Sequence, residues 1–161
     1  MSKHVVDVIW QARDGDEFLS GRYSRAHTLR FDGGAVVAGS PSPSVVPAPW
    51  SDAAAVDPEE MFVAALSSCH MLWFLDFARR AKVEIRSYRD RAEGVMAKND
   101  EGRIAITRVA LRPRIDSDAD RATLEDLHHK AHAACFIANS VKCEIVVEPQ
   151  TESEGKEADH V

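Results

Sequence analysis

The strongest constraint on the fold is an apolar run over residues 61–78 that directly follows a helix-start pattern. Asp57 is a favourable N-cap, Pro58 suits the first helical turn, and Asp57 with Glu60 has the spacing of a capping box. Apolar side chains recur at helical spacing on one face (Phe62, Leu66, Cys69, Trp73 and Phe77) and also occupy the opposite face (Val63, Met71 and Phe74). We therefore predict a helix that is buried nearly all round and ends near residues 79–82.

This apolar run is interrupted in a way that argues against a membrane-spanning helix. Ser67, Ser68, His70 and Asp76 lie within it, and a lipid-facing helix would resist them. The first ten residues lack the apolar core of a secretion signal, so we expect a cytoplasmic protein. The net charge of -6 argues against partners such as nucleic acids and anionic membranes. A small neutral substrate or a protein partner is the expectation that remains.

The rest of the chain predicts an α+β domain over residues 1–149. Residues 83–115 alternate as a β-hairpin around a turn at 99–102, and a slip of phase predicts a bulge near Thr107 or Arg108. The other expected segments are strands at 5–9, 18–31 and 143–147, an irregular loop at 40–55, a second helix capped by Ser117 or Asp118 and continuing to Ala134, and a flexible polar tail at 150–161.

Three cysteines are the main candidates for chemistry: Cys69, Cys135 and Cys143. A cysteine on a core helix is most often a small hydrophobic residue, and burial disfavours its reactive thiolate. The polar residues around Cys69 favour the alternative that the helix meets a cavity there. His70 should point about 100° away from Cys69 on the helix, so we expect a hydrogen-bonded, partly buried histidine. Cys143 alternates with core positions of a strand, and we assign it no role.

Cys135 closes the second helix and has two possible roles. It is either a buried thiol at a helix end or, if its Cα lies about 4.4–6.8 Å from that of Cys69, a disulfide partner. His128, His132 and Cys135 also share one helical face and could ligate zinc. Because no recognised zinc motif accompanies them, we expect solvent-facing or hydrogen-bonded histidines and no bound metal.

Two motifs resemble a known family when they occur in this order. The sequence Asp-Pro-Glu-Glu at 57–60 leads into Ser-Ser-Cys-His at 67–70, and Ala-His-Ala-Ala-Cys follows at 131–135. This combination resembles the OsmC/Ohr (osmotically inducible and organic hydroperoxide resistance) family, and most of all its OsmC-like branch. The resemblance implies hairpins and sheets wrapped around long central helices in an intertwined homodimer. It also implies reduction of organic hydroperoxides to alcohols.

The resemblance further implies a role for each of four residues. Cys69 would be the reactive thiolate and Cys135 the resolving thiol, while Arg25 would hold the thiolate and Glu59 would orient Arg25. Arg22 is the reserve for the arginine. No bound cofactor is implied, but an external dithiol, of the lipoyl type or another thiol, must reduce the disulfide.

Spacing along the helix adds one constraint to these roles. Ten residues separate Glu59 from Cys69, which is about 15 Å on a continuous helix. The two side chains could not then share a site within one chain, so we expect a second subunit to complete each site. Two alternatives stay open: a small-molecule or metal-binding stress protein of this fold without efficient turnover, and a dimeric interaction protein with inert thiols.

Overall fold

The computed structural model describes residues 1–150 and divides after Met61 into two compact units. Together they contain eight β-strands and two α-helices among the described residues, which confirms the α+β class. The predicted single domain over 1–149 stays a prediction. Of the predicted tail, Gln150 is described and its backbone N–H donates to the carbonyl oxygen of Pro113, while the rest lies outside the described residues.

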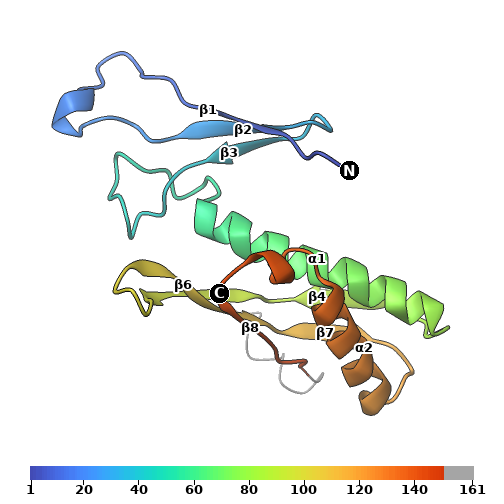
Figure 1. Ribbon diagram of the computed structural model, residues 1–161. Helices are drawn as coiled ribbons and strands as arrows, with labels where there is room; N and C mark the ends of the chain where they lie inside the picture. Colours follow the sequence, from blue (N-terminus) through green and yellow to red (C-terminus); the bar gives the residue numbers. More distant parts are fainter. Residues whose placement is uncertain (151–161) are drawn as a thin grey trace. The chain divides into compact units, whose positions relative to one another are not determined.

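The N-terminal unit is built on an antiparallel sheet of three strands, ordered β1 (Val6–Ile9), β2 (His27–Phe31) and β3 (Val36–Gly39) (Figure 1). Gly34 makes the β2–β3 turn with a φ of 90°, a conformation that favours glycine. The predicted strand over 18–31 is wrong in its first half, because Phe18–Ser20 form a 3-10 turn. There the Phe18 ring packs on Tyr23, with ring centroids 4.7 Å apart, which an extended strand would not allow.

Helix α1 (Pro58–Arg80) begins with the predicted capping box. The backbone N–H of Glu60 donates to Oδ1 of Asp57 at 2.7 Å, and that of Asp57 donates to Oε2 of Glu60 at 3.0 Å. The prediction that this helix is buried nearly all round is wrong for a single chain. Its buried residues form one stripe at every fourth position (Leu66, His70, Phe74 and Ala78). Leu72, on another face, is 61% exposed, because within the C-terminal unit the strands and the second helix cover only one side of α1.

The predicted hairpin over 83–115 is present but divided between two sheets. Strands β5 (Glu93–Lys98) and β6 (Ile104–Leu111) pair near the turn, and β4 (Ser87–Asp90) and β7 (Pro113–Asp116) pair at the far end. The predicted bulge is confirmed, because the pairing passes from Arg108 to Ile106 and leaves Thr107 opposite no residue. The last strand, β8 (Glu144–Val147), joins β6 in parallel.

The N-cap of helix α2 (Arg121–Ala134) lies two residues after the later of its two predicted caps. Asp120 is the N-cap, and its Oδ1 accepts the backbone N–H of Thr123 at 2.7 Å. Ser117 and Asp118 bond to other parts of the chain instead. The Ser117 hydroxyl donates to the carbonyl of Glu84, and the Asp118 carboxylate pairs with Arg86. Contacts with a distant part of the chain therefore decided where this helix begins.

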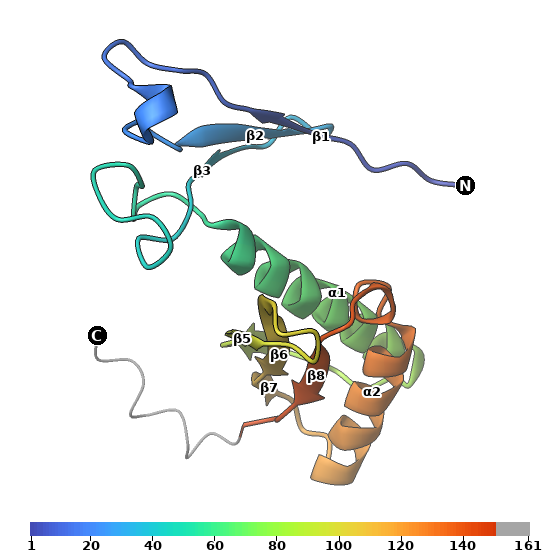
Figure 2. The same cartoon turned by 60° about the vertical axis from the view of Figure 1, so that its left-hand side comes forward.

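The C-terminal unit has two apolar clusters, one towards each end of α1. Figure 2 shows the backbone around them, with α2 beside the later part of α1. Towards the end of α1, Phe74 and Ala78 pack against α2, and towards its start, Leu66 packs against β6. Gly94 of β5 allows close approach there, because a Cβ at this position would lie 2.6 Å from Cγ2 of Val63. Cys143 joins the second cluster beside β8, as predicted for a core cysteine.

Helix α1 is long and apolar enough to cross a membrane by length and composition alone, a test that core helices of soluble proteins also pass. Two polar side chains of α1 bond to other elements of the C-terminal unit, which favours a core helix. The Ser67 hydroxyl donates to Oδ2 of Asp90 at 2.5 Å, and Nε2 of His70 lies 3.0 Å from Nδ1 of His128.

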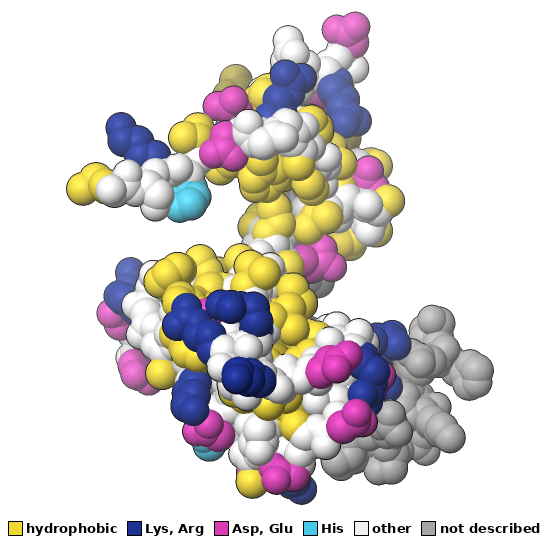
Figure 3. Space-filling model, turned by 90° about the vertical axis from the view of Figure 1, so that its right-hand side faces the viewer, with side chains coloured by type: hydrophobic (Ala, Val, Ile, Leu, Met, Phe, Trp, Pro, Cys, Tyr) yellow, Lys and Arg dark blue, Asp and Glu magenta, His cyan; other side chains and the backbone are white. Residues whose placement is uncertain are grey.

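Apolar side chains also lie on the surface of the N-terminal unit, where hydrophobic groups are visible in Figure 3. All four residues of β1 are exposed. The larger exposed apolar residues of this sheet are Val6, Val8, Ile9, Phe31 and Val36. An apolar surface of this kind is typical of a protein interface.

Candidate functional site

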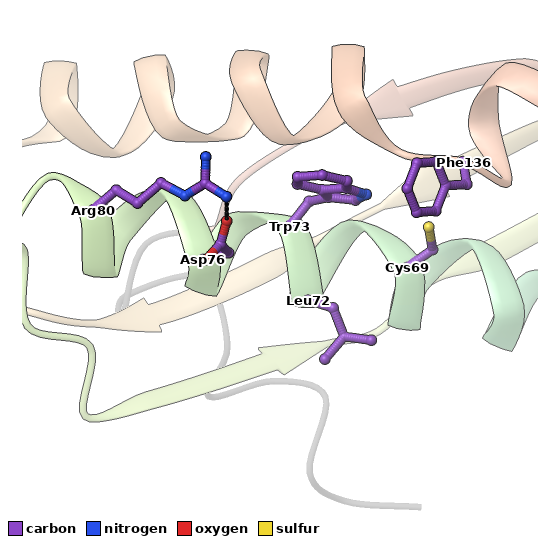
Figure 4. A pocket seen from close by; sticks show the side chains of 6 residues that line it. All are labelled: Cys69, Leu72, Trp73, Asp76, Arg80 and Phe136. Atoms are coloured by element: carbon purple, nitrogen blue, oxygen red, sulfur yellow. Dashed lines mark ion pairs between the residues drawn. The ribbon is translucent and has the colours of Figure 1, made fainter.

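A pocket of about 310 Å³ opens along α1 beside Cys69. It is lined by Cys69, Leu72, Trp73, Asp76 and Arg80 of α1 and by Phe136, which follows α2. Figure 4 shows the sulfur of Cys69 on the side of Phe136, with Asp76 and Arg80 at the other end. The pocket is therefore apolar next to the thiol and charged at its distant end.

The structure brings Cys69 and Cys135 together. Both are free thiols, and Cys69 is near enough to Cys135 to raise the pKa of its thiol. Cys135 caps the C-terminus of α2, and Phe136, the next residue, packs edge-on against Trp73 with ring centroids 5.3 Å apart. This aromatic contact holds the end of α2 against the turn of α1 that follows Cys69.

The two thiols differ in their surroundings. Cys135 is 1% exposed, and burial raises the pKa of its thiol to about 11, an effect to which the neighbouring Cys69 adds. At neutral pH the Cys135 sulfur is therefore protonated. It also accepts the backbone N–H of Ala138 at 3.4 Å. Cys69 is only half-buried and lines the pocket, so it is the sulfur that a ligand reaches first.

The charged side chains at the distant end of the pocket form ion pairs with one another. Asp76 pairs with Arg79 at 2.8 Å and with Arg80 at 2.6 Å, and the hydrogen bond from Arg79 is the main cause that lowers the pKa of its carboxyl group. Arg80 follows Cys69 by three turns of α1, about 16 Å along the helix. Its guanidinium is thus too far away to hold a thiolate at position 69.

The arginine and glutamate that the resemblance assigned to the site belong to the N-terminal unit. The Arg25 guanidinium lies 4.1 Å from the centroid of the Tyr23 ring and donates to the Tyr23 carbonyl at 2.9 Å. Arg22, the reserve, pairs with Glu17 and is largely exposed. Glu59 lies half-buried in the first turn of α1. Their roles towards Cys69 stay predictions.

A buried histidine pair is the feature that sequence reasoning missed. His70 and His128 are 1% and 2% exposed, and their rings stack with centroids 5.3 Å apart. Burial, followed by the neighbouring histidines, lowers the pKa of His70 to about 3 and that of His128 to about 4. Both rings are therefore neutral at physiological pH. The spacing of His70 four residues after Leu66 and four before Phe74 could have placed it on the buried stripe.

The polar residues around Cys69 have partners of their own. Ser67 bonds to Asp90 of β4, and the backbone N–H of Arg112 donates to the same carboxylate at 2.6 Å. These bonds fix α1 to the sheet two residues before Cys69. Within residues 1–150, no three His, Cys, Asp or Glu side chains converge on a point that could hold a metal ion. The Nδ1 atom of His128 faces His70, so the predicted face of His128, His132 and Cys135 is not assembled as a ligand set.

The family model described as OsmC-like protein matches residues 51–150, well over half of the chain. The structure of an OsmC-like protein of unknown function from Vibrio cholerae is 48% identical in sequence, with a TM-score of 0.89 over 93% of this chain and 100% of that one. No curated protein matches the chain in sequence.

Two more distant structures share the fold. An organic hydroperoxide resistance protein OsmC from Legionella pneumophila is 17% identical, with a TM-score of 0.67 over 94% of this chain and 97% of that one. The organic hydroperoxide resistance protein OhrB of Bacillus subtilis is 21% identical, with a TM-score of 0.59 over 92% of this chain and 98% of that one. At these identities the likeness concerns the fold alone.

Proposed function

Because the chain belongs to the OsmC-like protein family, we propose that it is a cytoplasmic thiol peroxidase that reduces organic hydroperoxides to alcohols. The observation that carries the proposal is the pair of neighbouring free thiols beside an apolar pocket. One thiol is accessible and the other is buried and protonated. In a peroxidase that forms a disulfide in each cycle, the accessible sulfur meets the peroxide and the second thiol condenses with the sulfenic acid.

The reaction consists of two displacements, the first at a peroxide oxygen and the second at sulfur. The Cys69 thiolate attacks the terminal oxygen of the hydroperoxide, the O–O bond breaks, and the alkoxide takes a proton to leave as the alcohol. The sulfur is oxidised to a sulfenic acid. Cys135 then attacks the Cys69 sulfur, the S–O bond breaks, and water and a disulfide form. An external dithiol returns two electrons and two protons to the disulfide, which regenerates both thiols.

The apolar walls of the pocket predict a preference for bulky substrates. Leu72, Trp73 and Phe136 can cover the organic group of a hydroperoxide, and buried apolar area is worth about 25 cal/mol per Å². We expect a higher kcat/KM for cumene hydroperoxide than for hydrogen peroxide. In Phe136→Ala the value for cumene hydroperoxide should fall about tenfold, while that for hydrogen peroxide changes little. The measurement is steady-state kinetics with a dithiol reductant, and Leu19→Ala, at a fully exposed apolar residue of the other unit, is the control. Equal kcat/KM values for the two peroxides in the wild type would contradict the predicted preference.

We assign the stabilising cation to Arg25, oriented by Glu59, in a homodimer whose sites each combine residues from two chains. Two observations support a second chain: the length of α1 between Glu59 and Cys69, and the apolar surfaces of α1 and β1 that one chain leaves exposed. An arginine beside the sulfur would favour its anionic form. The exposed apolar side of α1 would then be covered by the partner rather than by lipid.

Mixing two inactive variants tests this arrangement. Arg25→Ala and Cys69→Ser should each have little activity, but heterodimers of the two contain one intact site. An equal mixture after subunit exchange should therefore recover about a quarter of the wild-type activity. Sedimentation should show a dimer in each case. A mixture as inactive as its components, or a fully active monomer, would contradict the shared site.

A further inference from the structure

A second pocket in the C-terminal unit has none of the residues that line the Cys69 pocket. Its volume is about 300 Å³, and it lies between the first half of α2, strand β7 and the segment after β8. It is lined by Pro113, Ile115, Ala119, Arg121, Leu124, Glu125, His128, Pro149 and Gln150. Most of its walls are apolar, and the proposed peroxidase reaction makes no use of it.

One residue that lines this pocket has a buried nitrogen without a partner. His128 is 2% exposed, and its Nδ1 is bonded to His70, but its Nε2 has no hydrogen-bond partner within residues 1–150. Phe74 stacks on the ring with centroids 4.3 Å apart and fixes its plane. A buried polar atom without a partner is costly, so a ligand that supplies one gains affinity.

The chemistry of the pocket selects a neutral ligand with a hydroxyl group. Arg121 and Glu125 pair at 2.6 Å on the rim, where both are substantially exposed, so their charges offset each other. One proton is shared between Nδ1 of His128 and Nε2 of His70. When His128 holds it, Nε2 of His128 is an acceptor. When His70 holds it, Nε2 of His128 carries the other proton and is a donor. A hydroxyl can both donate and accept, and it therefore suits either state.

We propose that this pocket binds a small neutral phenol, with the aromatic ring against Ile115 and Leu124 and the hydroxyl bonded to Nε2 of His128. A pocket of this size holds one such ring. The site is independent of the peroxidase proposal, because it requires neither Cys69 nor Cys135.

Phenol itself is the probe for the test. Added to the full chain at pH 7, it should bind with a dissociation constant on the order of 1 mM. In long-range ¹H–¹⁵N spectra of the imidazoles, the signals of His128 and its partner His70 should shift and saturate, while those of the exposed His129 stay in place. Toluene, which lacks the hydroxyl, should bind on the order of tenfold more weakly.

Two variants locate the binding. Ala119→Phe places a large side chain in the pocket and keeps both histidines. It should weaken phenol binding at least about tenfold, with His70 and His128 signals present in the free state. Phe136→Ala alters the Cys69 pocket and should leave phenol affinity unchanged. The proposal is overturned if Ala119→Phe binds phenol as the wild type does, if toluene and phenol bind equally, or if the His128 signals do not saturate.

Discussion

Replacing Cys69 with serine should lower the rate of organic hydroperoxide reduction by at least about 1000-fold, because a hydroxyl cannot replace the thiolate as the attacking group. The chain has three cysteines, so a thiol titration follows the reaction directly. One equivalent of cumene hydroperoxide should reduce the wild-type count from three free thiols to one. In Cys69→Ser the same treatment should leave both remaining thiols intact.

The other two cysteines provide the controls. Cys135→Ser should lose one thiol and retain a sulfenic acid at position 69 that a dimedone probe labels, since no resolving thiol can displace it. Cys143→Ser should behave as the wild type does, because Cys143 belongs to the core cluster beside β8. If Cys69→Ser keeps its activity, or if Cys143→Ser prevents disulfide formation, the assignment of the two sulfurs is wrong.

The buried histidine pair should make the protein lose stability in mild acid. The pKa of His70 is about 3 and that of His128 about 4 in the folded chain, both below the ordinary value of 6.5. Between pH 6.5 and 4 the unfolded chain therefore binds more protons than the folded chain, so stability is greatest above pH 6.5 and falls as the pH falls. Two such groups predict a loss of about 2.7 kcal/mol for each pH unit in the middle of this window.

Denaturant unfolding at pH 7, 6 and 5 measures this slope. The titratable neighbours of the pair are His129 and His132 on α2 and Tyr88 on β4. Burial is the main cause that raises the pKa of Tyr88. Protonation of carboxyl groups with lowered pKa values, such as those of Asp118 and Glu148, also destabilises the folded chain, but only below about pH 4.5. The histidine contribution is thus separated from theirs by pH.

Variants identify the groups responsible for the slope. The double variant His70→Leu with His128→Phe removes both imidazoles together and should flatten the slope between pH 6.5 and 5. His4→Gln alters an exposed histidine of the N-terminal unit and should leave the slope unchanged. A double variant as sensitive to pH as the wild type would show that these rings do not govern the response.

Local features of the sequence predicted several structural details correctly. The capping box at Asp57 and Glu60 needs only neighbouring residues, and so does the phase slip that predicts the bulge at Thr107. The alternation of Cys143 with Ile145 predicted its place in the core. In each case the interaction spans a few residues of the chain, and the pattern of side chains contains the necessary information.

Features that depend on distant partners could not be predicted in this way. Helix α2 begins at Arg121 rather than after Asp118, because Arg86 binds the Asp118 carboxylate. His70 finds its partner His128 on another helix, and the burial of the pair lowers both pKa values. The exposed side of α1 could not be foreseen either, since it depends on how much of the helix one chain can cover.

The sequence alone determined that residues 58–80 form one capped helix with a cysteine on it, because helix propensity, capping and apolar spacing act within a few turns. Only the tertiary structure decided that Cys135 lies beside Cys69 and that the two sulfurs differ in exposure. The physical reason is that proximity and burial arise from packing between α1 and α2, which are separated in sequence by four strands.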